Sequence, residues 1–140
     1  MLIGSLALAV AAAYTGAALY INLVEQPARL ALDDAAMLAE WGPSDRRGFA
    51  YLATLALVAA VLALGAYFAA SDLRWLIGGL IIVASWPYAF FAMVPMNNRI
   101  LALSNGDAAS ARALVRDWGM LEIGQTAIGV VACAIFLWAL

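Results

Sequence analysis

The sequence predicts an all-α integral membrane protein, a four-helix bundle that forms one transmembrane domain over residues 1–140. The first observation is composition: 67% of the residues are hydrophobic and only 11% are charged, far from the balance of a soluble domain. The second is length, because a helix needs roughly 20 apolar residues to cross the hydrocarbon core. Four stretches are that long, and their lack of alternating polarity favours helices over barrel strands. They cover about residues 2–24, 49–70, 75–96 and 119–140.

The first stretch has no charged residue before Glu25. It has no positively charged beginning and is longer than the apolar part of a signal peptide, so we expect it to be a retained span. The connection that follows, residues 26–48, contains apolar residues at helical spacing. This spacing predicts an interfacial helix that ends at Gly42-Pro43 and precedes the uncharged second span. The apolar residues of this helix are Leu30, Met37, Leu38 and Trp41.

The third stretch contains Trp86-Pro87-Tyr88 near its middle. Proline removes a backbone hydrogen bond, so we expect a kink that opens space between the helices. That space would suit a flat ligand lined by Trp86, Tyr88, Phe90 and Phe91, although aromatic residues at these positions also serve as packing or belt residues.

The fourth stretch follows a turn at Asn105-Gly106. Asp107 is a suitable helix cap, and residues 108–118 contain no helix breaker. These features predict one long helix that starts outside the membrane and continues through the fourth span.

Arginine is distributed unevenly among the connections. Six of the seven positive charges lie after the first and third stretches, and only Arg74 lies on the other side. The positive-inside rule then places the long connections in the cytoplasm and both termini outside, as for a protein of the bacterial inner (cytoplasmic) membrane. Nothing here forms a basic surface, so we expect membrane lipid and no nucleic acid as a partner.

Several chemistries lack their usual residues. The chain has no histidine, and Cys133 is its only cysteine. Histidine is the commonest general base and metal ligand, so we expect no metal site and no cofactor. Small residues in the second span, including Gly65, permit close helix contacts and homo-oligomers.

Polar residues gather at one end of three predicted helices. Helical spacing groups Asn22 with Glu25 and Arg29 on the first helix, and Trp118 with Glu122 and Gln125 on the fourth. The end of the third stretch brings Asn97, Asn98 and Arg99 to the same level. We interpret this cluster as a candidate site. The alternative is structural: a Glu25–Arg29 ion pair, with the two asparagines capping a broken helix.

Glu122 is the most informative of these residues. A carboxylate exposed to lipid is unfavourable, so we expect it to face the bundle interior. Two cases are open. It is either ionised and paired with Arg29 or Arg99, or it lacks a cation and is a neutral hydrogen-bond donor that can handle protons.

Four sequence runs resemble the anthrone-oxygenase-like family of four-span membrane proteins, whose bacterial members are largely a domain of unknown function. They are residues 20–29 (YINLVEQPAR), 85–88 (SWPY), 95–99 (PMNNR) and 118–122 (WGMLE). The resemblance implies the four-span fold and, from fungal members, oxidation of anthrones to anthraquinones without an evident cofactor. Relatives often carry histidine where this chain has Gln26, and histidine and arginine where it has Glu122 and Gln125.

Two functions follow as hypotheses. The first is a cofactor-independent oxidase or oxygenase of a flat, apolar, polyketide-like aromatic molecule, with Glu25, Arg29 and Glu122 as catalytic residues. Its substrate would contact Asn22, Trp86, Tyr88, Asn97, Asn98, Arg99, Trp118 and Gln125. The second is a non-catalytic binding or assembly protein that holds a lipid or a partner helix in the same space.

Overall fold

The computed structural model describes residues 1–140 as nine helical segments with no strand. They form four long runs, each long and apolar enough to cross a membrane. The predicted all-α four-helix bundle of an integral membrane protein is therefore confirmed. The segments are α1 (Leu2–Tyr20), η1 (Ile21–Glu25) and α2 (Gln26–Leu30) in the first run, α3 (Asp34–Ala70) in the second, α4 (Leu73–Val83), α5 (Ser85–Tyr88), η2 (Ala89–Met93) and α6 (Val94–Leu103) in the third, and α7 (Ala108–Ala139) in the fourth.

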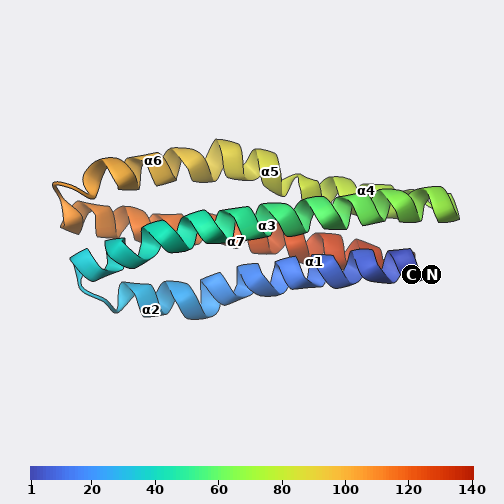
Figure 1. Ribbon diagram of the computed structural model, residues 1–140, viewed down its shortest axis with the longest axis horizontal. Coiled ribbons are helices and arrows are strands. Elements are labelled where there is room, and N and C mark those ends of the chain that lie inside the picture. The colour runs from blue at the N-terminus through green and yellow to red at the C-terminus, as the bar shows by residue number, and fades with distance from the viewer.

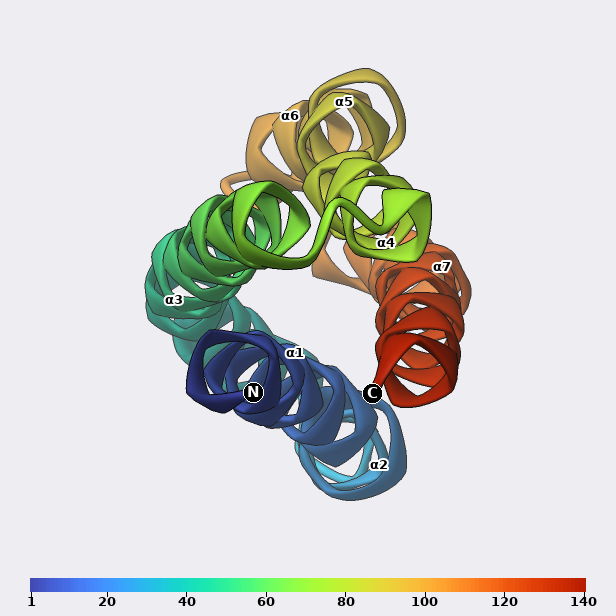
Figure 2. The same ribbon diagram turned by 90° about the vertical axis from the view of Figure 1, so that its right-hand side faces the viewer.

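The four runs lie up and down beside one another (Figure 1). Viewed along the bundle they form a ring in which α1 contacts α3 and α7, and α4 contacts the same two helices (Figure 2). Both termini and the α3–α4 turn lie at one end, which we call the apolar end. The α2–α3 and α6–α7 loops lie at the other, which we call the polar end, and the corresponding halves of the bundle take the same names.

Aspartate caps the three helices that follow loops. Asp33, Asp72 and Asp107 accept hydrogen bonds from the backbone N–H groups of Ala36, Arg74 and Ser110, respectively, at 2.8–3.0 Å. Each carboxylate satisfies a first-turn donor that has no partner inside its helix. The predicted Asp107 cap and the long fourth helix are both confirmed.

The core of the apolar half is built largely from alanine. Small side chains let helices approach closely, and Trp75 stacks on Phe136 with ring centroids 5.5 Å apart. Gly65, singled out as a small residue that could support oligomers, packs inside the bundle, where an added Cβ would meet Ile3. The buried alanines of this core are Ala7, Ala11, Ala18, Ala56, Ala59, Ala63, Ala66, Ala132 and Ala139.

The polar half is wider because the first and third runs diverge there (Figures 1 and 2). Each run contains a π-helical turn, η1 or η2, followed by a helix with proline at its second position. Pro27 and Pro95 cannot donate a backbone hydrogen bond and would clash with the carbonyl four residues earlier. The N–H groups of Gln26 and Val94 instead bond the carbonyls five residues back, which places an extra residue in each turn.

The kink expected from Pro87 is also present. Helix α4 ends at Val83, a single turn residue follows, and α5 begins at Ser85. The interruption lies three to four residues before the proline, where its ring and missing N–H disturb the helix. The remainder of the third run consequently leans away from α4 (Figure 2).

The predicted helix end at Gly42-Pro43 is wrong. The segment from Asp34 is helical, as expected, but α3 continues through Pro43 to Ala70 without a break. Met37 and Trp41 are buried before the proline, and Leu52 is buried after it. Packing on both sides therefore holds the helix together, while the proline itself is exposed and removes only one hydrogen bond.

Candidate functional site

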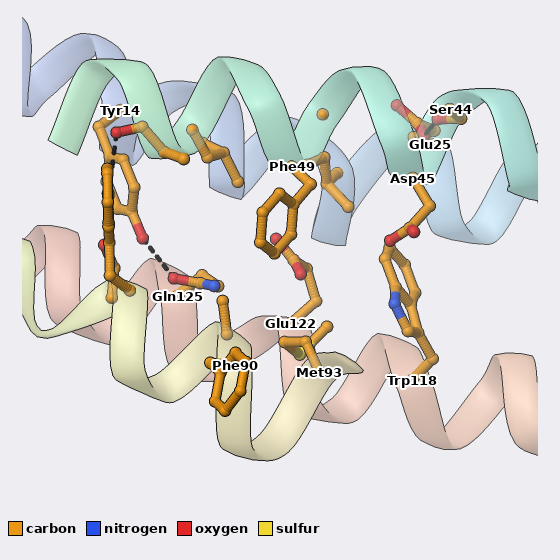
Figure 3. Close-up of a pocket in the computed structure, with 17 residues that line it drawn as sticks. Tyr14, Glu25, Ser44, Asp45, Phe49, Phe90, Met93, Trp118, Glu122 and Gln125 are labelled. Atoms are coloured by element: carbon orange, nitrogen blue, oxygen red, sulfur yellow. Dashed lines mark hydrogen bonds between the residues drawn. The ribbon is translucent and has the colours of Figure 1, made fainter. Parts of the chain in front are cut away.

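A cavity of about 240 Å³ lies inside the polar half, between all four runs (Figure 3). Both π-helical turns contribute to its wall, so the widening that they cause creates the space. Most of the lining is apolar or aromatic, with a small number of polar groups. The 17 lining residues are Tyr14, Ile21, Glu25, Ser44, Asp45, Gly48, Phe49, Leu52, Ala53, Ser85, Trp86, Ala89, Phe90, Met93, Trp118, Glu122 and Gln125.

The polar groups divide the cavity into three levels. Glu122 lies near the middle, opposite Phe49 and Met93 (Figure 3). Tyr14 and Gln125 lie toward the apolar end. Glu25, Ser44, Asp45 and Trp118 lie toward the polar end. An elongated, flat molecule could therefore meet polar groups at both ends and a carboxyl group between them.

Glu122 is only 4% exposed, so the expectation that it faces the interior is confirmed. It forms no ion pair, and its Oε1 atom is buried without a hydrogen-bond partner. Of the two cases that the sequence leaves open, the ion pair with Arg29 or Arg99 is absent, and the carboxyl group without a cation partner is the one observed. Arg29 is engaged elsewhere, and Arg99 is exposed on the outside of α6. An unpartnered carboxyl oxygen at such depth is unfavourable unless something else binds it.

Arg29 is 2% exposed and ties three runs together. Its guanidinium pairs with Glu25 and Glu40 and donates to Gln26 Oε1 at 2.7 Å and to Ser44 Oγ at 3.1 Å. It also lies over the Trp118 ring, 5.2 Å from the centroid. The structural alternative, a Glu25–Arg29 ion pair, is thus present. Arg29 does not line the cavity, which makes it a positioning residue.

Tyr14 fixes the amide of Gln125. The tyrosine hydroxyl donates to Gln125 Oε1 at 2.5 Å, which leaves the Nε2 atom on the side of Glu122 (Figure 3). The hydroxyl of Ser85 is buried at the same cavity and has no hydrogen-bond partner. Amide and hydroxyl groups are hydrogen-bond donors, so this end of the cavity suits an acceptor such as a carbonyl oxygen.

Asp45 contributes the second carboxyl group that has no cation partner. Its Oδ2 atom accepts a hydrogen bond from Asn97 Nδ2 at 2.8 Å, which links α3 to α6. Asn97 therefore acts through Asp45 and does not line the cavity. Asn97 and Asn98 lie inside α6, so the idea that they cap a broken helix end is wrong.

Six of the residues predicted for the site or for its aromatic wall line the cavity: Glu25, Trp86, Phe90, Trp118, Glu122 and Gln125. Others are used in packing between helices. Asn22 accepts a hydrogen bond from Thr126 at 2.6 Å, and the Tyr88 hydroxyl donates to the Leu121 carbonyl at 2.6 Å. Asn98, like Arg99, is exposed.

Sequence reasoning missed Tyr14, Ser44, Asp45, Ser85 and Met93 as lining residues. A signal for α3 was present in the spacing of Asp45, Phe49 and Leu52, which a continuous helix places on one face. A helix end at Gly42-Pro43, as the sequence predicts, hides this continuity. No group of three or more His, Cys, Asp or Glu side chains is close enough together to hold a metal ion.

The sequence model of one protein family, the anthrone oxygenases, matches residues 41–135, which is more than half of the chain. The matched stretch includes Asp45, Ser85, Trp118, Glu122 and Gln125. The resemblance inferred from the sequence is therefore confirmed. No curated protein and no solved structure matches the chain.

Proposed function

From the premise that this chain belongs to the anthrone oxygenase family, we propose that it is a membrane-embedded oxygenase of flat, lipid-soluble aromatic ketones. Its reaction would convert a ring methylene group, activated by a carbonyl across the ring, into a second carbonyl with O₂ as oxidant. The cavity around Glu122 is the proposed active site.

The observation that carries this proposal is the state of Glu122. Its carboxyl group is buried in a mostly apolar cavity, has no ion pair, and keeps one oxygen without a hydrogen-bond partner. A carboxylate that is desolvated in this way is a stronger base than one in water, which suits removal of a proton from carbon. The aromatic and aliphatic walls, including Phe49 and Met93, suit a flat ring system.

The proposed reaction balances with O₂ as the only co-substrate. Glu122 accepts a proton from the methylene carbon, and the electron pair moves to the carbonyl oxygen to form an enolate. The enolate transfers its electrons to O₂, a carbon–oxygen bond forms at the former methylene carbon, and the resulting peroxide takes the proton back from Glu122. Loss of water, which carries away the last hydrogen of that carbon, leaves the second carbonyl. One CH₂ group and one O₂ thus give one C=O group and one water.

Gln125 and Ser85 are the proposed enolate-binding residues. Donors fixed before the reaction stabilise developing charge most effectively in a site without water. Gln125 is held by Tyr14, and the Ser85 hydroxyl is buried without a hydrogen-bond partner. Gln125 lies one helical turn from Glu122, so the base and the donor face the same ligand from neighbouring positions. Arg29 and Arg99 do not line the cavity, so neither is proposed to bind the enolate.

The proposal is tested by oxygen uptake with anthrone, using protein purified in detergent. We expect Glu122→Gln to lower the rate by at least about 100-fold, within the range typical of a lost general base. The matched control is Asp117→Asn, which changes an exposed carboxylate on the same helix and should leave the rate unchanged. Binding of anthraquinone to each variant, followed by fluorescence quenching, shows whether the cavity is intact.

Three outcomes are informative. Turnover that depends on Glu122 supports the oxygenase. Binding of anthraquinone without any oxygen uptake would contradict it and favour the non-catalytic binding protein. Equal rates for the Glu122→Gln and Asp117→Asn variants would show that Glu122 does not take part in the reaction.

For the orientation, we propose that the polar end faces the cytoplasm and that both termini lie outside. The support is the arginine imbalance between the two ends. In a Cys133→Ala background, Asn105→Cys should resist a membrane-impermeant thiol reagent in intact cells, while Ser71→Cys at the apolar end should react. The reverse pattern would overturn the orientation.

A further inference from the structure

One side of the cavity reaches the outer surface of the bundle. Phe49, Trp86 and Phe90 line the cavity, yet they are 42%, 45% and 65% exposed. The opposite wall is different, because Tyr14, Glu122 and the rest of the polar lining from α1 and α7 are buried. The cavity is therefore open on the side between α3 and the α5–η2 segment.

Two hydrogen bonds frame this opening. Trp86 Nε1 donates to the Ala53 carbonyl at 3.1 Å, and Asn97 Nδ2 donates to Asp45 Oδ2 at 2.8 Å. They join α3 to the third run at positions eight residues apart on α3, or about 12 Å at 1.5 Å per residue. Between them η2 bulges, and its extra residue carries the backbone away from the straight helical path. We name the opening between these two bonds the window.

The window extends from the level of the hydrocarbon core, at Trp86 and Phe90, toward the polar end, where Asp45 and the exposed Arg46 lie outside the expected span 49–70. Trp86 and Phe90 are close to the middle of the run Leu73–Leu103, and residues 75–96 include no charged side chain. Exposed aromatic side chains at this level would face lipid tails and not water. A molecule that passes the window must therefore be soluble in lipid and free of charge.

We propose that the ligand enters and leaves the cavity sideways, from the bilayer, through the window, with Trp86 as its movable edge. This inference rests on the proposed function for the class of ligand, a flat uncharged aromatic ketone. The ligand passes with its ring edge between Phe49 and Phe90 and turns its carbonyl oxygen toward Gln125 and Ser85. Breaking the single hydrogen bond of Trp86 to Ala53 frees the indole to move.

A second route into the cavity is the competing explanation. An outer groove between α1 and α3 shares five lining residues with the cavity, and these form the partition between the two: Ile21, Glu25, Ser44, Gly48 and Leu52. The Ser44 hydroxyl donates a hydrogen bond to Glu25 across this partition. The polar part of that partition is tied to Arg29 through Glu25 and Ser44, whereas the window is already open to the surface and its Trp86 edge is held by one hydrogen bond. The experiment therefore has to block each route separately.

The test uses the full chain in nanodiscs and anthraquinone as an unreactive probe, with association and dissociation followed by stopped-flow fluorescence. Ala53→Trp narrows the window and should slow both rates at least tenfold. Val58→Trp adds the same side chain at an exposed position of α3 away from the cavity, and Ala39→Trp fills the outer groove. Both controls should keep the wild-type rates.

Trp86→Phe provides a variant with the opposite expected effect. It keeps an aromatic ring but removes the hydrogen bond to Ala53, so both rates should increase several-fold. This variant keeps the inference testable if Ala53→Trp does not fold. Unchanged association and dissociation rates in Trp86→Phe would contradict entry through the window. Slow binding in Ala39→Trp but not in Ala53→Trp would contradict it as well.

The outcomes for the window and for the proposed function can be told apart. If anthraquinone binds and the window variants change nothing, the window is wrong while the oxygenase proposal stands. If anthraquinone does not bind the wild-type protein at all, the ligand class is wrong and both proposals fall.

Discussion

The two halves of this bundle are built from the same four helical runs, but their side chains pack differently. In the apolar half nine of the fourteen core residues are alanine, and the helices approach closely around them. In the polar half only one of the seven core residues is alanine, and the others are larger. Because the side chains at a contact set the distance between helix axes, small residues close one half and large residues open the other.

The halves also differ in what holds them together. The core of the apolar half has no ion pair, and Arg74 pairs with Asp72 only at its outer end. The polar half is crossed by charged links: Arg29 joins α2 to α3, and Arg112 of α7 binds Asp34 and the carbonyls of Leu30 and Leu32. A bundle that contains a cavity loses packing contacts, and directional bonds around the cavity replace part of them. The site is therefore formed by looser packing in the polar half, while close packing in the apolar half stabilises the fold.

The strongest test of this comparison is to remove the central cation of the polar half. Arg29→Met keeps much of the side-chain volume but leaves Glu25 and Glu40 without their buried partner. We expect a loss of about 3–5 kcal/mol in the free energy of unfolding, measured by denaturation in mixed micelles. Arg99→Met is the matched control, and because Arg99 is exposed we expect a change within about 0.5 kcal/mol. Equal effects would mean that the Arg29 network does not hold the polar half together.

A pair of alanine substitutions tests packing directly. Ala59 is fully buried in the apolar half, whereas Ala89 lines the cavity. Ala59→Leu should destabilise the protein by about 1–3 kcal/mol through overpacking. Ala89→Leu should have little effect on stability, because its added atoms occupy empty space, but it should weaken anthraquinone binding. If Ala89→Leu were the more destabilising variant, the difference in packing between the halves would be refuted.

The stability of a Glu122 variant gives a smaller effect. Glu122→Gln removes a buried carboxyl group that has no ion pair, so no cation is left unpaired. We expect the free energy of unfolding to change by no more than about 1 kcal/mol, in either direction. A loss close to that of Arg29→Met would instead reveal a cation bound to Glu122 in solution.

The smallest effect is expected outside the core. Asp107 accepts hydrogen bonds from the hydroxyl and, to a smaller extent, from the backbone N–H of Ser110, and both lower the pKa of its carboxyl group. A lowered pKa means that the stabilising contribution is present above the ordinary aspartate pKa and is lost as the pH falls through the lowered value. Asp107→Ala should therefore reduce the melting temperature slightly at neutral pH and not at all in strong acid. A pH-independent difference would show that the ionised cap contributes nothing.

The sequence was sufficient to predict the bundle, the long fourth helix and the inward position of Glu122. These features depend on composition, on helical spacing and on the high free energy of a carboxylate in lipid, all of which are local or general. The kink at Pro87 was predictable for the same reason, since proline acts on the helix that contains it.

The partners of the charged residues could not be predicted in the same way. Glu40 lies beside Arg29 because residues 34–42 are part of the continuous helix α3, which passes through Pro43. That continuity depends on the tertiary packing of Met37, Trp41 and Leu52. The same continuity brings Asp45 to the cavity. Patterns along one helix do not reveal which neighbouring helix supplies a partner, so the site was predicted at the correct end of the bundle but with several incorrect members.

The paired π-helical turns have a consequence for how the length of this chain can vary. Each of them, η1 and η2, holds one residue more than an ordinary helical turn would. Deleting a single residue there would restore a regular helix and remove the bulge that widens the bundle, while the residues beyond it would keep their faces because the bulge already absorbs the extra residue. A one-residue deletion before Pro27 would instead leave the proline inside a regular helix, where its ring clashes with the carbonyl four residues earlier. Insertions and deletions should therefore be tolerated in the loop at 104–107 but not in these two turns. A protein of this fold could then vary in its surface loop while the number of residues around its cavity stays constant.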